Sequence, residues 1–562
     1  MVVFQYQCPV GKVNERNTMT GNQAIAKILS IEGLDWFSCF PHHPLIDACA
    51  LEGMRPILCR QERAGVNIAD GFSRIKNGNT IGVFMMQSGP GAENAFGGVA
   101  QAYADSVPIL LLPGGPPRSR TGSDLTFEAV KNYQGVTKWV SNINSAARIP
   151  TMMRKAFSSL KQGKPGPVML EIPSDVGEEI IPDQSLDYVP VKPFKSGASQ
   201  EDVRDLVSAL LSAECPVISA GQGVLYAEAS EELIDFVEWT KIPVMTTLAG
   251  KSAFPETHPL SLGTGAASHS LMVATYLKKA DFFFGLGTSM TSGFKAEIPK
   301  GAVLAQSIIS HEDVNKEHQV EYGAIGDARI VLQQLLEEAK KQLGGKPRSD
   351  TKGNVLEISR LKKIWLNQWE PHFCSNEVPL SPYRIFREIA SLVDNTRSII
   401  THDSGYPREQ LAPFWETVTP RSYIGWGAST QLGYGLGLAI GAKIANPEKQ
   451  VINIMGDAAF GMAGLDIETA VRSEIPILTI ILNNGVMTHY DHHMAYATKR
   501  WGSNKLGGDY ATICKGMGAH AEKVSSPKQI GPAIQRALAA NIEGKPAVIE
   551  AITKVEENTS RY

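Results

Sequence analysis

The chain has 562 residues, enough for about three or four domains of ordinary size. Its 54 Lys and Arg against 57 Asp and Glu leave a formal net charge of −3, which argues against a nucleic-acid scaffold or a polybasic membrane binder. No apolar run approaches the roughly 18–20 residues that span a bilayer, and the first residues lack the layout of a signal peptide, so we expect a cytoplasmic protein.

Apolar runs of strand length alternate with longer segments of helical period along the chain, a pattern typical of parallel sheets with helices on both faces. Two polar stretches rich in Pro, Gly and Ser, 181–200 and 344–354, interrupt this alternation and are interpreted as linkers. They divide the chain into segments 1–185, 198–343 and 355–562. We therefore predict an α/β protein of three doubly wound parallel-sheet domains.

The outer two segments repeat short patterns in the same order. Residues 106–110 (SVPIL) resemble 473–478 (SEIPIL), and 163–169 (GKPGPVM) resemble 544–549 (GKPAVI), with a weaker version at 214–218 (ECPVI). Proline before a buried strand is ordinary punctuation in α/β proteins, which is the alternative explanation for any one repeat. Two repeats in the same order predict that the flanking domains are related.

The most informative motif joins two predicted strands of the third segment. One strand ends in Gly456-Asp457, and the next, 475–482, is followed by Asn483-Asn484, so that Asn484 follows Asp457 by 27 residues. A strand–helix–strand crossover of this length brings both strand ends to the same carboxyl edge of a parallel sheet, where α/β folds bind ligands. We expect Asp457 and Asn484 to lie side by side.

The residue types at this edge suit Mg²⁺ and a diphosphate. A carboxylate oxygen, an amide oxygen and a backbone carbonyl just past Asn484 are hard ligands of the kind that Mg²⁺ prefers. Gly456 and the small Ala458 and Ala459 let backbone N–H groups approach a diphosphate at the start of a helix. The alternative is that Gly-Asp is incidental and that Asn483-Asn484 is a plain turn at a strand end.

This pattern resembles the thiamin diphosphate signature of acetohydroxyacid synthase-like and pyruvate decarboxylase-like enzymes. The resemblance covers nearly the whole chain and extends to 62–74 (ERAGVNIADGFSR), 88–94 (SGPGAEN), 105–108 (DSVP), 257–260 (THPL) and 432–436 (LGYGL). It implies a pyrimidine-binding domain at 1–185, a central domain at 198–343 and a diphosphate-binding domain at 355–562. It also implies thiamin diphosphate and Mg²⁺ as cofactors, in a homodimer or homotetramer whose active sites are shared between chains.

The resemblance assigns roles to individual residues. Glu62 is expected to activate the aminopyrimidine of the cofactor, and the alternative is a helix N-terminal glutamate stabilised by the helix dipole. Leu432 is expected to hold the cofactor bent, and the alternative is core packing on a glycine-rich helix. Asp457, Asn484 and the carbonyl of Val486 are the implied metal ligands. The implied cofactor-binding set is Gly405, Tyr406, Thr430, Leu432, Gly456, Asp457, Ala458, Ala459, Asn484, Val486 and Met487.

Several positions depart from the patterns of the known groups. His43, in the segment Pro41-His42-His43-Pro44, is interpreted either as a proton shuttle or as one of a surface histidine pair. Gln87 stands where benzoylformate decarboxylase-like members carry a histidine, which argues against their proton relay. Asp124 replaces the glutamine of the synthase Phe-Gln-Glu motif, which leaves the product open.

The segment 485–493 (GVMTHYDHH) also differs from the synthases. Met487 and His489 are interpreted as walls of the substrate pocket. Three histidines with an aspartate in this segment raise the alternative of a second metal, but a loop over the substrate is the favoured interpretation.

The central segment leaves its ligand open. Relatives bind FAD there in the synthases and ADP in oxalyl-CoA decarboxylases and 2-hydroxyacyl-CoA lyases, and residues 221–227 (GQGVLYA) resemble the second group slightly more. The acidic residue expected after the strand 303–309 is replaced by Ser310-His311, so an empty central site is a third alternative.

Together these observations predict a thiamin diphosphate- and Mg²⁺-dependent enzyme that cleaves or forms a C–C bond beside a carbonyl. An acetolactate synthase-like reaction with a 2-oxo acid donor is the leading interpretation. A 2-hydroxyacyl-CoA lyase or oxalyl-CoA decarboxylase, acting on an acyl-CoA or aldehyde, is the first alternative, and a catalytically silent binding or regulatory relative is the second. A nucleotide-dependent dehydrogenase is disfavoured because no GxGxxG follows a strand with an acid downstream. Neither nucleic acid nor membrane is an expected partner.

Overall fold

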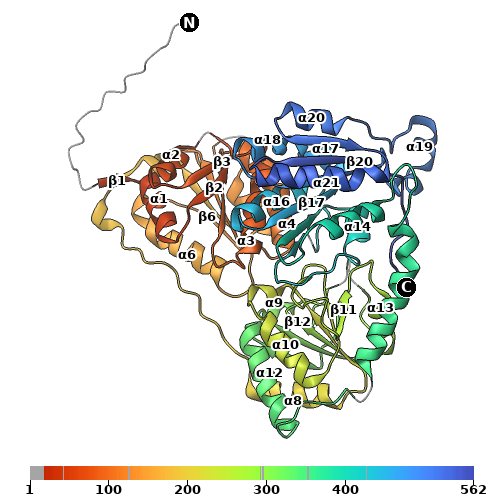
Figure 1. Ribbon diagram of the computed structural model, residues 1–562. Coiled ribbons are helices and arrows are strands. Elements are labelled where there is room, and N and C mark those ends of the chain that lie inside the picture. The colour runs from red at the N-terminus through yellow and green to blue at the C-terminus, as the bar shows by residue number, and fades with distance from the viewer. Residues whose placement is uncertain are drawn as a thin grey trace.

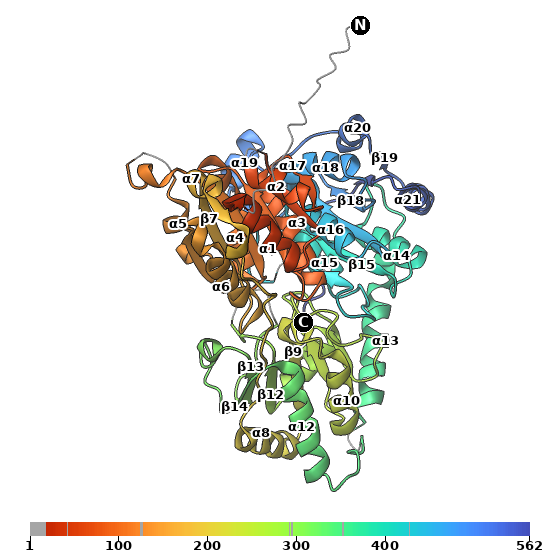
Figure 2. The ribbon, with the colours of Figure 1, turned by 90° about the vertical axis from the view of Figure 1, so that its left-hand side faces the viewer.

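The structure is a computed structural model, and it shows three α/β lobes, each built on a six-stranded parallel sheet (Figure 1). This confirms the predicted fold class. The residues that it describes are 18–41, 43–123, 127–291, 293, 296–350, 353–425 and 427–562. His42 and Asp124, named above, lie outside these ranges. The first and third lobes lie side by side, and the central lobe packs beneath both, as the two views agree (Figures 1 and 2).

The first sheet has the strand order β3-β2-β4-β5-β7-β6. Its strands are β2 (Trp36–Cys39), β3 (Arg55–Leu58), β4 (Gly82–Met86), β5 (Ile109–Gly115), β6 (Trp139–Asn142) and β7 (Val168–Pro173). The helices are α1 (Gly21–Ile31), α2 (Pro44–Leu51), α3 (Glu62–Ile75), α4 (Pro90–Ala104), α5 (Ala129–Asn132), α6 (Ile149–Lys161) and α7 (Ser174–Glu178). An antiparallel pair, β1 (Thr18–Thr20) with β8 (Ile180–Pro182), joins the two ends of this lobe. The inner strands are buried on both faces, which explains why their sequences are almost continuously apolar.

The central sheet has the order β11-β10-β9-β12-β13-β14. Its strands are β9 (Pro216–Ala220), β10 (Val244–Thr246), β11 (Ser261–Thr264), β12 (Phe282–Leu286), β13 (Val303–Ile308) and β14 (Tyr322–Ile325). The helices are α8 (Gln200–Ser212), α9 (Gln222–Tyr226), α10 (Ser230–Thr240), α11 (Leu271–Lys279) and α12 (Ala328–Gln342). Counted along the chain the strand order is 3-2-1-4-5-6, so the order reverses between β9 and β12.

The third sheet has the order β16-β15-β17-β18-β20-β19. Its strands are β15 (Ser398–His402), β16 (Tyr423–Ile424), β17 (Gln450–Gly456), β18 (Leu478–Asn483), β19 (His520–Val524) and β20 (Ala547–Ile552). The helices are α13 (Asn354–Phe373), α14 (Pro382–Leu392), α15 (Tyr406–Leu411), α16 (Tyr434–Ala445), α17 (Asp457–Ala463), α18 (Ile467–Arg472), α19 (Ala495–Trp501), α20 (Tyr510–Gly516) and α21 (Pro527–Ile542). The long helix α13 leads from the central lobe into this one (Figure 1).

The two flanking sheets share one topology, as the repeated segments predict. Both read 2-1-3-4-6-5 when their strands are counted along the chain. Ser106 and Glu474, at equivalent places before β5 and β18, both adopt a left-handed backbone with φ of 56° and 55°. Gly163 and Gly544, before β7 and β20, do the same with φ of 64° and 83°. The repeats therefore mark the same helix-to-strand turns in both domains.

One detail of the sequence interpretation was wrong. The strand predicted at 475–482 begins only at Leu478, because Glu474 is left-handed and Pro476 has no N–H to donate to a neighbouring strand. The segment 214–218 leads into the buried strand β9, and the central lobe has a further left-handed turn at Lys241, with φ of 55°, before β10.

Helix α3 of the first lobe packs directly against α16 of the third, and glycines allow the close approach. A Cβ on Gly71 would lie 2.4 Å from the carbonyl oxygen of Leu438, and one on Gly441 would lie 2.0 Å from that of Ile68. The glycine-rich stretch of α16 is therefore a packing surface.

Among the residues that the structure describes, no helix combines the length and apolarity needed to cross a membrane.

A buried ion cluster closes the same interface. The guanidinium of Arg74 on α3 donates to Asp70 at 2.6 Å, to Asp105 at 2.8 Å and to the hydroxyl of Tyr434 on α16 at 2.7 Å. The carboxylate of Asp105 also accepts from the main chain of Gly427 at 3.0 Å. Part of the motif 62–74 and the aspartate of 105–108 therefore hold the lobes together.

Candidate active site

A cleft of about 330 Å³ lies at the carboxyl edge of the third sheet. The segments that follow three neighbouring strands, β15, β17 and β18, form its walls. Every residue of the predicted cofactor-binding set lines it: Gly405, Tyr406, Thr430, Leu432, Gly456, Asp457, Ala458, Ala459, Asn484, Val486 and Met487. The strand order reverses between β15 and β17, which is where open α/β sheets bind ligands.

The three predicted metal ligands converge on one wall of this cleft. Asp457 Oδ2 accepts a hydrogen bond of 2.9 Å from the N–H of Gly485, which ties the end of β17 to the end of β18. Asn484 Oδ1 accepts from the N–H of Val486 at 3.1 Å, while its amide group donates to Thr488 at 2.9 Å. The adjacency that the spacing predicts is thus present.

Electrostatics favour a cation beside these oxygens. Burial raises the pKa of Asp457, and hydrogen bonds from the main-chain N–H groups of Gly485 and Ala458 oppose that rise. A divalent cation would further stabilise the carboxylate by direct ligation. A carboxylate, an amide oxygen and a carbonyl form a donor set that fits Mg²⁺, and the size of the cleft fits a small cofactor.

Asp403 is a site residue whose function the sequence analysis did not identify. Its fully buried carboxylate follows β15 and accepts from the N–H groups of Ser404 at 2.7 Å, Gly433 at 3.1 Å and Gly435 at 2.8 Å. Burial raises its pKa to about 6, against the effect of these bonds. Asp403 therefore fixes the start of α16. Two of its three partners, Gly433 and Gly435, lie about 30 residues away, so no local pattern in the sequence predicts these bonds.

Leu432 stands between the core and the cleft. It is half-buried, packs against the apolar core beneath α16 and lines the cleft with its remaining surface. The next residue, Gly433, has φ of 84°, and this left-handed turn allows α16 to begin directly after Leu432. The core packing that the alternative interpretation describes is present, and the role of Leu432 in holding the cofactor bent stays a prediction.

The predicted residues of the first domain lie at a different sheet edge. Glu62 is the first residue of α3, is 5% exposed, and accepts a hydrogen bond of 3.2 Å from Asn94 on α4. It follows β3, whereas His43 follows β2 and Gln87 follows β4, and these three strands are neighbours. Glu62, His43 and Gln87 therefore share the carboxyl edge of the first sheet. None of them lines the cleft in the third domain of the same chain.

His43 has a defined local role. Its Nδ1 accepts a hydrogen bond of 3.1 Å from the N–H of Leu45 and caps α2, and its ring packs against Gly114 of β5. Because Nδ1 accepts, a neutral His43 carries its proton on Nε2. The residue is 9% exposed, so the interpretation as a surface histidine is wrong. Gln87 is half-buried at the end of β4.

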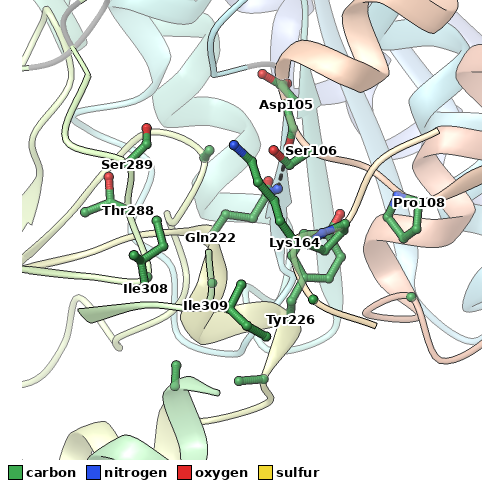
Figure 3. A pocket seen from close by; sticks show the side chains of 18 of the residues that line it. Asp105, Ser106, Pro108, Lys164, Gln222, Tyr226, Thr288, Ser289, Ile308 and Ile309 are labelled. Atoms are coloured by element: carbon green, nitrogen blue, oxygen red, sulfur yellow. Dashed lines mark hydrogen bonds between the residues drawn. The ribbon is translucent and has the colours of Figure 1, made fainter. Parts of the chain in front are cut away.

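A second cavity, of about 420 Å³, lies between the first and central lobes (Figure 3). It sits at the carboxyl edge of the central sheet, where Gln222 and Tyr226 follow β9 and Thr288 and Ser289 follow β12. Gln222 donates a hydrogen bond of 2.7 Å to the carbonyl oxygen of Asp105, which joins the two lobes beside the cavity. This edge is again a point where the strand order reverses.

Charged side chains of both signs line the central cavity: Lys161, Lys164, Lys195 and Lys316 together with Asp105 and Asp327. Lys164 and Lys316 line it, and both pair with Asp313, at 2.6 Å and 3.2 Å. Asp313 ends the short turn 311–313 after β13, where Ser310 and His311 replace the expected acid. Asp313, the buried carboxylate of this turn, is therefore paired with two lysines of the cavity wall, and it balances their charge.

Three family models match the chain in order along its length. They are described as thiamine pyrophosphate enzyme domains: the N-terminal TPP binding domain over residues 19–143, the central domain over 203–335 and the C-terminal TPP binding domain over 403–551. Each match includes most strands of one of the three sheets.

The chain is also similar over most of its length to several named proteins. It is 31% identical to a probable acetolactate synthase large subunit of Methanococcus aeolicus, over 92% of this chain and 90% of the relative. It is 32% identical to the corresponding protein of Methanocaldococcus jannaschii, over 93% and 90%. It is 28% identical to a glyoxylate carboligase of Escherichia coli O157:H7, over 90% and 88%.

Proposed function

Because the chain belongs to the thiamine pyrophosphate enzymes, in their acetolactate synthase-like group, we propose that it joins two carbonyl compounds, with a 2-oxo acid as donor. In this reaction the bond between the carbonyl carbon and the carboxylate of the donor breaks and CO₂ leaves. The carbonyl carbon then forms a bond to the carbonyl carbon of an acceptor, whose C=O π bond breaks and whose oxygen takes up a proton. The observation that carries the proposal is the convergence of Asp457, Asn484 and Val486 on one wall of the cleft.

The residues of the cleft would hold thiamin diphosphate (thiamine pyrophosphate) through its diphosphate and Mg²⁺. Asp457, Asn484 and the carbonyl of Val486 would bind the Mg²⁺, and the backbone N–H group of Ala459 suits a diphosphate oxygen. The N–H group of Ala458 donates to Asp457 at 2.9 Å and so supports a metal ligand instead. Leu432 would support the bent cofactor from below. When bound, thiamin diphosphate supplies an electron sink that stabilises negative charge at the donor carbonyl carbon.

Proton handling would fall to the edge of the first sheet. The Glu62 carboxylate would hold a proton at a ring nitrogen of the cofactor, with Asn94 keeping its Oε2 in place at 3.2 Å. The neutral ring of His43 carries its proton on Nε2, because Nδ1 accepts from the N–H of Leu45, and His43 would act as a proton donor through that atom. Gln87 offers an uncharged amide beside them.

Sharing of the site between two chains would explain the separation of these two edges. Glu62, His43 and Gln87 do not line the cleft of their own third domain. A second copy of the chain would bring its first-sheet edge to the cleft, so we propose a homodimer or a homotetramer. Gel filtration with light scattering of the holoenzyme would test this, since a monomer with full activity contradicts a shared site.

We also propose that the protein is cytoplasmic, which cell fractionation would test.

The decisive test of the reaction is a comparison of donors with thiamin diphosphate and Mg²⁺ present. Pyruvate and glyoxylate are offered alone and in pairs, and CO₂ and the condensation product are measured. Release of CO₂ together with a new C–C bond supports the proposal. Formyl-CoA or aldehyde release from acyl-CoA substrates, without turnover of 2-oxo acids, would instead support an acyl-CoA lyase or decarboxylase. No turnover of either class would support a silent relative.

The ligand of the central cavity is a separate proposal. Its place at the reversal of strand order supports an adenine nucleotide, FAD or ADP, with an empty cavity as the alternative. Denaturing the purified protein and analysing the supernatant distinguishes these three cases. Flavin absorbance indicates FAD, a chromatographic ADP peak indicates ADP, and neither indicates an empty cavity.

A further inference from the structure

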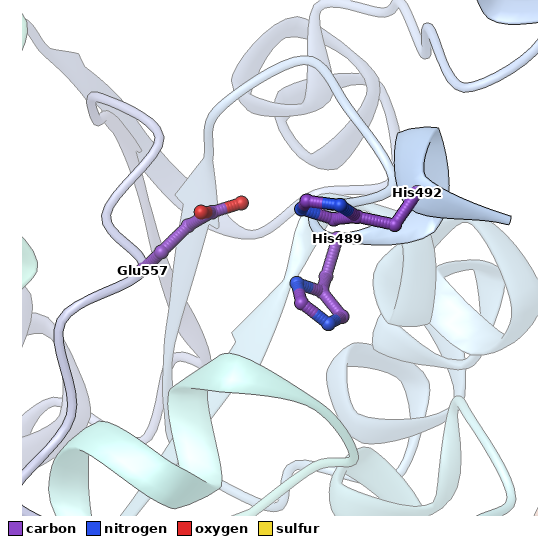
Figure 4. A group of neighbouring side chains, drawn as sticks. All are labelled: His489, His492 and Glu557. Atoms are coloured by element: carbon purple, nitrogen blue, oxygen red, sulfur yellow. The ribbon is translucent and has the colours of Figure 1, made fainter. Parts of the chain in front are cut away.

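Two histidines and a glutamate from distant parts of the chain lie close together (Figure 4), close in the chain to Thr488, Tyr490 and Glu556, which line the cleft. His489 and His492 lie on the loop that follows β18, and Glu557 lies on the tail that follows β20. One ligand atom from each of the three side chains lies within 4.8 Å of the other two. All three side chains are exposed. They are distinct from the predicted Mg²⁺ ligands.

Local backbone geometry explains why the two histidines face the same way. Residues Tyr490–His492 form one turn of 3₁₀ helix, and His489 caps it with a left-handed φ of 73°. Side chains three residues apart in such a turn lie nearly one above the other. The two imidazole rings accordingly lie with centroids 4.6 Å apart.

Hydrogen bonds on both sides of Glu557 hold the tail in place. The carbonyl oxygen of Glu556 accepts from Gln410 at 2.7 Å, and that of Asn558 accepts from the hydroxyl of Tyr383 at 2.6 Å. Ser560 is buried and accepts from the indole of Trp365 at 2.9 Å. The backbone around Glu557 is therefore fixed, whereas its side chain is free to turn toward the histidines.

We propose that His489, His492 and Glu557 bind a first-row transition metal ion, with Zn²⁺ as its representative. Two imidazoles and one carboxylate, with a fourth position left open to water, form a ligand set that suits Zn²⁺, whereas Mg²⁺ prefers oxygen ligands only. Tetrahedral bonds of about 2.1 Å require ligand atoms about 3.4 Å apart. The ligand atoms lie within 4.8 Å of one another in the structure, and small rotations of these exposed side chains would bring them to the distance that the metal requires.

This ion would act as a clamp across the entrance to the cleft. Met487, Thr488 and Tyr490 of the loop line one side of the cleft, and Lys554 and Glu556 of the tail line another. A metal ion held by both segments ties these walls together beside Tyr406, whose ring centroid lies 6.5 Å from that of His489. Bound Zn²⁺ is therefore expected to slow passage of substrate or cofactor. The metal site rests on the three side chains alone, and the effect on turnover rests on the proposed function.

Equilibrium dialysis against Zn²⁺ tests the site directly. The holoenzyme, with thiamin diphosphate and excess Mg²⁺, is compared with its His492→Ala and Glu557→Gln variants, and bound zinc is measured by atomic spectroscopy. We expect one tightly bound Zn²⁺ per chain, with affinity lowered at least about tenfold in either variant. His493→Ala is the matched control, because its ring belongs to the same loop but not to the three-residue group, and it should bind as the wild type does. Equal affinity of the wild type and Glu557→Gln would overturn the site.

Inhibition measurements then test the clamp. Zn²⁺ should inhibit turnover of the wild type at saturating Mg²⁺, and Glu557→Gln should need at least about tenfold more Zn²⁺ for the same inhibition. If the wild-type enzyme binds Zn²⁺ and still turns over at its full rate, the proposal that the ion acts as a clamp is wrong. If no donor is turned over, the proposed function fails, and dialysis still decides the metal site.

Discussion

The buried carboxylate of Asp403 accepts a hydrogen bond of 3.1 Å from the main-chain N–H of Gly433, and this bond fixes where α16 begins. The second oxygen accepts from Gly435 at 2.8 Å. Leu432 directly precedes this turn. The position of the Leu432 side chain in the cleft therefore depends on Asp403, which lies more than twenty residues earlier in the chain.

Replacement of Asp403 by Asn should weaken cofactor binding and lower stability. In asparagine an NH₂ group takes the place of one carboxylate oxygen, and it cannot accept a hydrogen bond from a backbone N–H. At least one of the bonds to Gly433 and Gly435 is therefore lost, at a cost of about 1–3 kcal/mol. Denaturant unfolding and the thiamin diphosphate concentration for half-maximal activity are the measurements. Asp235→Asn, at an exposed position on α10, is the control. Unchanged stability and cofactor affinity in Asp403→Asn would contradict this role.

Glu62→Gln should bind cofactor normally but lose turnover. The amide keeps the shape of the side chain and its contact with Asn94 but cannot hold a proton at the cofactor ring, so we expect a loss of about 10²–10⁴ in kcat. Steady-state kinetics and cofactor titration separate the two effects. Glu201→Gln is the matched control, because Glu201 also stands in the first turn of a helix but is exposed. A Glu62→Gln enzyme as active as the wild type would disprove the proton role.

Arg74→Met should destabilise the interface between the first and third lobes. The substitution leaves Asp70 and Asp105 buried without their cation, and breaking a buried ion cluster in this way costs about 3–5 kcal/mol. Thermal and denaturant unfolding are compared with Arg204→Met, where the arginine is exposed on α8. Equal unfolding midpoints of the two variants would show that the cluster does not hold the lobes together.

His402 should make the protein sensitive to acid. Burial lowers its pKa to about 3, and Arg408 adds to the effect. The unfolded chain takes up a proton at His402 near pH 6.5, whereas the folded chain does not. The contribution of neutral His402 to the free energy of unfolding is therefore fully present above pH 6.5 and is lost as the pH falls toward 3. At pH 5 the loss is about 2 kcal/mol.

Unfolding of His402→Gln at pH 7.5 and pH 5 isolates this contribution. Glutamine does not titrate, so the variant should lose about 2 kcal/mol less than the wild type between the two pH values, whatever its stability at pH 7.5. Identical losses in the two proteins would mean that His402 takes up its proton in the folded state.

The sequence predicts features that depend on chain spacing. The 27 residues from Asp457 to Asn484 form one crossover, so the adjacency of the two side chains follows from the geometry of a parallel sheet. The repeats before β5 and β18 predict the shared strand order, because each marks a left-handed helix end that precedes a buried strand.

Features that depend on contacts between distant segments were beyond sequence reasoning. The bonds from Asp403 to Gly433 and Gly435, and the contact of Arg74 with Tyr434, join positions that no local pattern connects. The grouping of His489 and His492 with Glu557 likewise depends on the path of the tail back to the cleft. The roles assigned to Glu62 and Leu432 stay predictions, because each needs the cofactor to be tested.

The central claim is that Asp457 binds the cofactor through Mg²⁺, and calorimetric titration of thiamin diphosphate tests it most directly. Wild-type protein and Asp457→Asn are titrated with and without Mg²⁺, and circular dichroism checks that the variant is folded. We predict binding by the wild type that depends on Mg²⁺ and an affinity at least about tenfold lower in Asp457→Asn. Equal, Mg²⁺-independent binding by the two proteins would contradict the account.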